Sequence, residues 1–228
     1  MRRFERLLYR LVAFLVLFAL PVALVAQVSG LGAYLTPESV ARDGTPAQID
    51  FPRWLWVRNE GGSDGAGLCV FRSATNSGGI WHRDRIEGFF DWMKRKPGGG
   101  YPSKFAKMLT QYCNEQGIEE PAYVQVQSSD QSVSEILDLL ERAVNDDLMP
   151  AITYSFSPSG RYGGGRVSHM VNLVAARAGP SRLWAIMDNN YDSSYEWMSE
   201  NDFRRTFGGG GAWAIIFLSP GPPPVPRN

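Results

Sequence analysis

Residues 57–73 read VRNEGGSDGAGLCVFRS, and this stretch carries the clearest structural signal in the chain. A glycine-rich loop, residues 61–67, leads to Cys69 at the start of an apolar segment that favours a helix. A helix N-terminus presents unpaired backbone N–H groups and a positive dipole end, which favour the nucleophilic thiolate form of a cysteine. The same N–H groups are able to bind the oxyanion of an acyl-transfer intermediate. A buried structural cysteine is the alternative interpretation of Cys69.

Two later segments supply the other side chains that acyl transfer needs. His169 begins a predicted strand over 169–176, and Asp188 and Asn189 directly follow a predicted strand over 183–187. A short hairpin joins these strands, so the end of the second lies beside the start of the first. A carboxylate or carboxamide at that end is placed to hold the imidazole in the proton-accepting tautomer. Either residue fits, since one position of register separates them, and we prefer Asn189 over Asp188.

The chain has only two histidines and two cysteines, so the rival groups are few. His82 lies on a predicted helix 13 residues after Cys69 and is interpreted as a helix-face residue rather than the base. Cys113 lies on an amphipathic helix and is interpreted as a half-buried structural thiol. Two cysteines are too few for a four-cysteine zinc site, and we expect no metal and no organic cofactor.

The order of the predicted elements indicates the fold class. Helical periodicity dominates the first half and short apolar strands dominate the second, which is typical of an α+β fold with a mostly antiparallel sheet. The expected helices cover residues 80–94, 101–116, 132–145 and 199–207, and the expected strands 122–127, 151–156, 169–176, 183–187 and 212–218.

A cysteine on a helix, followed by a histidine and an Asn or Asp on adjacent strands, resembles the papain-like cysteine peptidases. The run from Val57 to Gly61 looks like that family's Asn-Gln-Gly entry to the cysteine loop, and the compact spacing is nearer to the bacterial bacteriocin-processing (C39-like) type. The resemblance implies that Cys69 is the nucleophile and His169 the base. The resemblance also implies an oxyanion hole at the Cys69 N–H, where either the Asn59 carboxamide supplies a second donor, or the N–H acts largely alone, or activity is impaired.

The chain departs from the family pattern at two places. His169 follows Cys69 by 100 residues, whereas the papain–cathepsin spacing is about 130–150. Glu60 stands where the family has its oxyanion glutamine, and an ionised glutamate accepts hydrogen bonds instead of donating them. We expect Glu60 and Trp197 at the cleft, with Trp197 packed over the His–Asn hydrogen bond.

Charge restricts the classes of partner. The chain has 23 Lys and Arg and 23 Asp and Glu, without the basic excess that is typical of nucleic-acid-binding proteins. We therefore expect no nucleic-acid partner, and the resemblance implies a peptide or protein substrate.

The two ends of the chain differ from its body. Residues 1–26 join an arginine-rich start to a 16-residue uncharged apolar run, which predicts a secretory signal peptide or an N-terminal membrane anchor. Residues 27–50 are expected to be a linker, residues 51–218 the papain-like domain, and residues 219–228 a proline-rich tail. Membrane contact is expected only through an uncleaved N-terminal segment.

Taken together, these features predict an exported cysteine peptidase that hydrolyses peptide or isopeptide bonds. A transglutaminase-like acyltransferase, in which an amine replaces water, has the same order of catalytic residues. A non-catalytic peptide-binding module on the same fold is the third possibility, and Glu60 is its best support.

Overall fold

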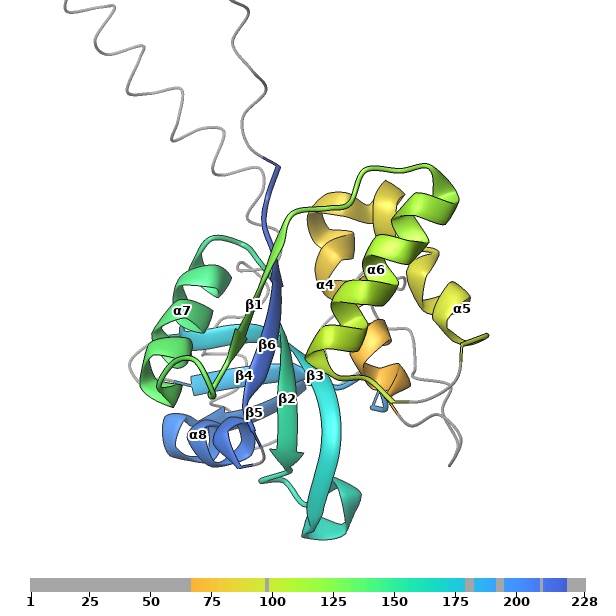
Figure 1. Ribbon diagram of the computed structural model, residues 1–228. Coiled ribbons are helices and arrows are strands. Elements are labelled where there is room, and N and C mark those ends of the chain that lie inside the picture. The colour runs from red at the N-terminus through yellow and green to blue at the C-terminus, as the bar shows by residue number, and fades with distance from the viewer. Residues whose placement is uncertain (1–66, 97–98, 179–182, 192–194, 210, 221–228) are drawn as a thin grey trace, which may run out of the picture. The chain divides into compact units, whose positions relative to one another are not determined.

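The computed structural model describes residues 67–96, 99–178, 183–191, 195–209 and 211–220 (Figure 1). The predicted signal or anchor segment 1–26 and the predicted linker 27–50 lie outside these ranges, as do Asn59, Glu60 and most of the predicted tail. Within the described ranges, no helix is both long enough and apolar enough to cross a membrane.

Helices and strands are arranged as an α+β fold, which confirms the predicted class. The described part of the chain begins with three helices and ends mainly in strands. In chain order the elements are α4 (Leu68–Ile86), α5 (Phe89–Met93), α6 (Pro102–Gln116), β1 (Tyr123–Gln127), α7 (Val133–Asn145), β2 (Ala151–Phe156), the 3₁₀ turn η2 (Arg161–Gly164), β3 (Arg166–Ala178), β4 (Leu183–Met187), β5 (Tyr195–Ser199), α8 (Glu200–Gly208) and β6 (Trp213–Phe217).

Two boundaries differ from the sequence-based prediction. The helix expected at 80–94 is the end of the longer helix α4, and it stops at Ile86 before a separate short helix, α5. The backbone of His82 leaves helical geometry (φ −132°, ψ 36°), so α4 bends at that residue. Strand β3 begins at Arg166, and His169 therefore lies inside the strand, opposite Tyr154 of β2, rather than at its opening.

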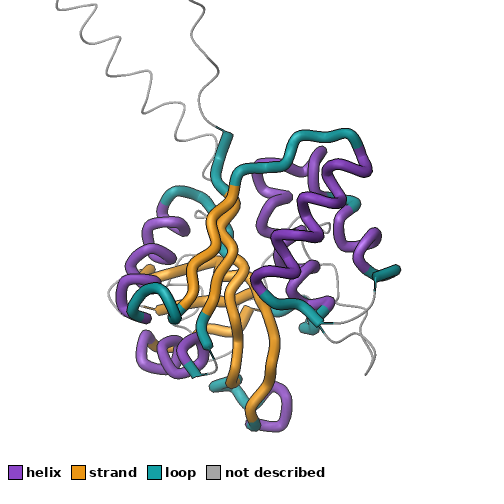
Figure 2. The backbone as a smooth tube through the Cα atoms, in the orientation of Figure 1, coloured by secondary structure: helices purple, strands orange, loops and turns teal. Residues whose placement is uncertain are grey.

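The six strands form one sheet in the order β1-β6-β2-β3-β4-β5, and every neighbouring pair is antiparallel. Figure 2 shows the sheet between two groups of helices. Helices α4, α5 and α6 pack on one face, and α7 and α8 on the other.

Alternation along the strands builds a separate core on each face of the sheet. In β6, Trp213, Ile215 and Phe217 pack with α4–α6, whereas Ala214 and Ile216 pack with α7 and α8. Successive side chains of a strand point to opposite faces, so a central strand covered on both sides is apolar throughout. Helix α4, which carries Cys69, is thus held in place by packing against one face of the sheet.

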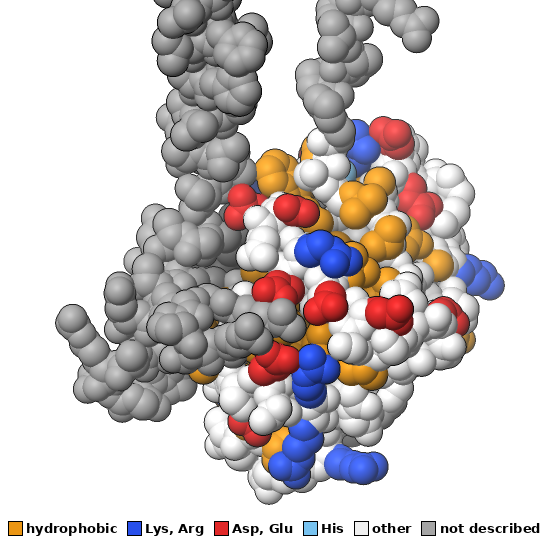
Figure 3. Space-filling model, turned by 90° about the vertical axis from the view of Figure 1, so that its left-hand side faces the viewer, with side chains coloured by type: hydrophobic (Ala, Val, Ile, Leu, Met, Phe, Trp, Pro, Cys, Tyr) orange, Lys and Arg blue, Asp and Glu red, His pale blue; other side chains and the backbone are white. Residues whose placement is uncertain are grey.

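Charged side chains are distributed without a dominant sign on the face shown in Figure 3, where acidic and basic groups are interspersed. This distribution agrees with the neutral formal charge of the sequence.

Candidate active site

Cys69 occupies the first turn of α4, and its exposed fraction is 7%. The residue that precedes the helix, Gly67, has a left-handed backbone (φ 85°) and supplies no side-chain cap to the first N–H groups. A Cβ on Gly67 would lie 1.8 Å from the backbone nitrogen of Gly100, so a glycine is required where these two segments cross. The first N–H groups of α4 thus receive no side-chain cap from Gly67, and N–H groups at a helix start are the donors that an oxyanion site uses.

His169 is buried on β3 and contacts two chemically different partners. Its Nε2 lies 2.9 Å from Oδ1 of Asp188, and Cys69 is a further hydrogen-bonding partner of the ring. Because Nε2 donates its proton to the carboxylate, Nδ1 is the ring nitrogen left for the thiol. Burial lowers the pKa of His169, but hydrogen bonds with Asp188 and Cys69 and the charges of both groups outweigh it and raise the pKa to about 9.

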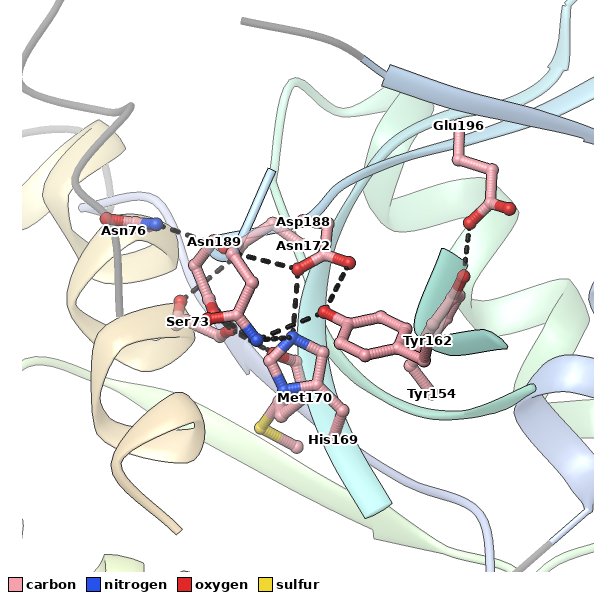
Figure 4. A network of polar contacts seen from close by, with 11 residues as sticks. Ser73, Asn76, Tyr154, Tyr162, His169, Met170, Asn172, Asp188, Asn189 and Glu196 are labelled. Atoms are coloured by element: carbon pink, nitrogen blue, oxygen red, sulfur yellow. Dashed lines mark hydrogen bonds and ion pairs between the residues drawn. The ribbon is translucent and has the colours of Figure 1, made fainter. Parts of the chain in front are cut away.

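Asp188 directly follows β4, is fully buried, and accepts from three donors (Figure 4). Oδ1 accepts from His169 Nε2 and, at 2.9 Å, from the backbone N–H of Asn190, while Oδ2 accepts from the hydroxyl of Tyr162 at 2.8 Å. Burial raises the pKa of Asp188, yet these hydrogen bonds and the charge of His169 hold it below the ordinary value for an aspartate. The carboxylate is thus ionised and aimed at the histidine.

The preference for Asn189 as the partner of His169 is wrong. Its side-chain nitrogen donates to the Ser73 hydroxyl at 2.8 Å and to the Met170 carbonyl at 3.0 Å, on the side of α4. Successive residues at the end of β4 point to opposite sides, so only one of the two neighbours reaches the ring. Asp188, the alternative, occupies that position (Figure 4).

The expectation that Trp197 covers the histidine is also wrong. Trp197 lies on β5 opposite Ala185, and the neighbouring Glu196 points to Tyr154, so Trp197 points away from that side of the sheet. The aromatic rings beside His169 belong to Tyr162 and Tyr154, with centroids at 5.6 and 6.2 Å.

The other histidine and the other cysteine have structural positions. His82 Nε2 lies 2.6 Å from the carbonyl oxygen of Leu218, which ties α4 to the end of β6. Cys113 is a free, buried thiol in α6. Burial and the charge of Glu120 raise the pKa of Cys113 to about 11, against a smaller opposing effect of Arg85. This thiol is therefore neutral at physiological pH.

Sequence reasoning missed Tyr162 and Asn190, which complete the surroundings of Asp188. Asn190 belongs to the predicted polar run after β4, so its position offered a signal. Tyr162 lies in the glycine-rich segment before β3, and nothing in its spacing connects it with Asp188. Only the return of that loop over the sheet brings the two side chains together.

A pocket of about 280 Å³ opens beside the start of α4. One of the residues that line the pocket, Gly100, packs directly against Val70 in the first turn of α4. The contact is so close that a Cβ on Gly100 would collide with the Val70 side chain. The lining residues are Gly100, Tyr101, Pro102, Gln127, Ser128, Ser129, Gly211, Ala212 and Trp213. In the part of the chain that the structure describes, no group of three or more His, Cys, Asp and Glu side chains is arranged to hold a metal ion.

No protein-family model matches this sequence, and no curated protein does. Among solved structures, the chain is similar to the Salmonella effector SpvD in its G161 variant, with 15% sequence identity and a TM-score of 0.36 over 82% of each chain. A likeness at this level does not indicate a function for this chain. The function is therefore inferred from the geometry of the site.

Proposed function

We propose that this protein is an exported thiol hydrolase that cleaves peptide or isopeptide bonds, with Cys69 as nucleophile, His169 as acid and base, and Asp188 as the residue that orients His169. One observation carries the proposal: the imidazole of His169 lies between the buried carboxylate of Asp188 and the cysteine at the start of α4. A nucleophile, a base and an orienting group in contact are the arrangement used for acyl transfer.

The protonation of His169 supplies the proton that the reaction needs. With a pKa of about 9, His169 is protonated at neutral pH, and it lies beside Cys69. The thiolate attacks the carbonyl carbon of the substrate, and the negative charge that develops on the carbonyl oxygen is stabilised by backbone N–H groups at the start of α4. The sequence offers the Asn59 carboxamide, which lies outside the described residues, as a second donor to the same oxyanion.

The remaining steps return the enzyme to its starting state. His169 donates the proton on Nδ1 to the departing amine as the carbon–nitrogen bond breaks, which leaves a thioester on Cys69 and a neutral imidazole. The imidazole then removes a proton from water as water attacks the thioester. The carboxylic acid product departs and its proton is lost to solvent, while Cys69 and His169 return to their starting protonation states.

The pocket supports the size of the substrate group, and the N-terminal sequence supports export. The pocket of about 280 Å³ is close to the lower end of ordinary ligand sites, about 300–1,000 Å³, and is formed by tyrosine, tryptophan, serine and glycine residues. It offers room for a substrate side chain beside the start of α4. Export rests on the arginine-rich start and apolar run of residues 1–26.

Covalent labelling of the full-length protein with an epoxysuccinyl inhibitor of papain-like enzymes tests the proposal. We expect one adduct on the intact protein, at Cys69, that disappears in Cys69→Ala and in His169→Ala. Cys113→Ala is the matched control and keeps the adduct, since Cys113 lies in α6 and belongs to the core.

Absence of an adduct on folded wild-type protein, with Cys69 shown to be free after denaturation, contradicts the proposal and favours the non-catalytic module. When an adduct forms, hydrolase and acyltransferase are separated by incubation with peptides and an excess of a primary amine. A free carboxylate in the product supports the hydrolase, and an amide to the added amine supports the transglutaminase-like reaction.

A further inference from the structure

We propose that Tyr162 is a positioning residue of this site, whose hydroxyl holds the Asp188 carboxylate so that Oδ1 faces His169 Nε2. This inference rests on the proposed function, because it assigns a task within the same site.

The two oxygens of Asp188 are held by different groups. Oδ1 accepts from His169 Nε2 and from the backbone N–H of Asn190, both at 2.9 Å, whereas Oδ2 accepts from the Tyr162 hydroxyl at 2.8 Å. The torsion that turns an aspartate carboxylate is soft, so one well-bound oxygen does not fix its plane. A donor at Oδ2 removes this freedom and keeps a buried acceptor from being left unpaired.

A second hydrogen bond decides which way the Tyr162 hydroxyl points. The Asn190 side-chain nitrogen lies 3.0 Å from the Tyr162 oxygen and 3.3 Å from His169 Nε2. Because Nε2 already carries the proton that it donates to Asp188, it cannot accept from Asn190, so the amide donates to the tyrosine oxygen. The hydroxyl proton is then free to point only at Asp188, and bonds in such a chain strengthen one another.

The ring of Tyr162 is held on the same side of the site. It meets the imidazole edge-on, at 5.6 Å and 61°, and contacts Tyr154 at 6.2 Å. The hydroxyl of Tyr154 donates to the buried Glu196, which also accepts from Ser157 and from the backbone N–H of Ser159. Figure 4 shows the two tyrosines along one side of the histidine, with Glu196 beyond them.

The backbone of Tyr162 lies in a region that residues other than glycine rarely adopt. Tyr162 has a left-handed conformation (φ 61°, ψ 26°) next to Gly163 and Gly164, which also have positive φ angles. A residue other than glycine is disfavoured in this region by about 1–2 kcal/mol. The contacts of its side chain with Asp188, Asn190 and His169 offset that penalty.

Substitution of Tyr162→Phe in the full-length protein removes only the hydroxyl and tests the inference. Tyr191→Phe is the matched control, because Tyr191 packs edge-on against Tyr162 at 5.4 Å and is 37% exposed. Two readouts are used. NMR follows the exchange of the His169 Nε2 proton at pH 7 in the free protein, and mass spectrometry follows the rate of epoxysuccinyl labelling at Cys69.

We expect Tyr162→Phe to exchange the Nε2 proton at least tenfold faster and to label about tenfold more slowly, as loss of one hydrogen bond to a charged group predicts. Tyr191→Phe changes neither rate. Asn190→Ala, which removes the donor that aims the hydroxyl, gives a smaller change in the same direction and is the second variant if Tyr162→Phe folds poorly.

The outcomes separate this inference from the proposed function. Unchanged proton exchange and unchanged labelling in Tyr162→Phe overturn the positioning role, whatever the wild-type activity is. No labelling of the wild type overturns the thiol mechanism, and the proton exchange still decides whether Tyr162 positions the carboxylate.

Discussion

The carboxylate of Asp188 and the amide of Asn189 leave the end of β4 on opposite sides. The first contacts His169, and the second joins the loop to Ser73 of α4 and to the backbone of β3. Both side chains are buried and hydrogen-bonded, so burial alone does not distinguish their tasks. Their tasks are distinguished by the groups that each side chain contacts.

Separate substitutions of Asp188 and Asn189 are expected to affect labelling and stability in opposite ways. Asp188→Asn removes the charge and the acceptor that set the tautomer of His169, and we expect labelling of Cys69 to fall by at least about a hundredfold with the fold retained. Asn189→Ala leaves His169 untouched but removes the donor to Ser73 and Met170. Its free energy of unfolding falls by about 1–3 kcal/mol, while labelling changes less than tenfold.

Chemical denaturation and labelling of both variants check this prediction. Full labelling of Asp188→Asn together with loss of labelling in Asn189→Ala would restore the amide as the orienting group.

The first turn of α4 is placed by a crossing of glycine backbones. Gly67 combines a positive φ with a Cβ position that is blocked by Gly100 and Gly99. Gly117, at the end of α6, also has a positive φ, of 66°, but nothing lies within 4 Å of its Cβ position. An alanine at Gly117 would therefore meet only backbone strain, whereas an alanine at Gly67 would meet backbone strain and a steric clash.

Gly67→Ala is expected to lower the free energy of unfolding by about 2–5 kcal/mol and to abolish labelling of Cys69, because the start of α4 must shift. Gly117→Ala has only the strained backbone and is expected to lower it by about 1 kcal/mol, with labelling unchanged. Equal losses in the two variants, measured by urea unfolding, would show that the crossing at Gly100 does not place the helix.

Global stability depends on pH through the buried site. The pKa of His169 is raised from an ordinary value of 6.5 to about 9, so the folded state binds the proton more tightly than the unfolded state does. The resulting stabilisation is complete below pH 6.5 and is lost as the pH rises through about 9. We expect the free energy of unfolding to fall by about 3 kcal/mol from pH 6.5 to above 9 through this group.

Urea unfolding of the wild type and of His169→Gln at pH 6.5 and pH 9.5 measures the effect. The variant is expected to lose most of the dependence between these two values. A wild type whose stability is the same at both would mean that His169 does not hold its proton more tightly in the folded protein.

The sequence alone predicted the α+β class and the positions of most helices and strands, and it singled out Cys69 and His169, on which the proposed function rests. Glycines before an apolar segment place Cys69 at a helix start, and the alternation of short apolar runs with turn residues marks the strands. These signals are local, since they depend on residues within one or two turns of each other.

Boundaries were less accurate than the elements themselves. Helix α4 extends back to Leu68 through a segment with no clear amphipathic period, because most of its first turns are buried on several sides. Strand β3 extends to Arg166 because it pairs with β2, which no local pattern records.

Tertiary structure alone decided between Asp188 and Asn189, moved Trp197 away from the site, and brought Tyr162 to Asp188. The first two depend on which side of a strand a residue faces, and a change of one position in register reverses it. The third depends on how a glycine-rich loop returns over the sheet. Residue types and local periodicity thus establish which chemistry is available, whereas side-chain direction and loop path, which are set by packing across the whole sheet, establish which groups meet.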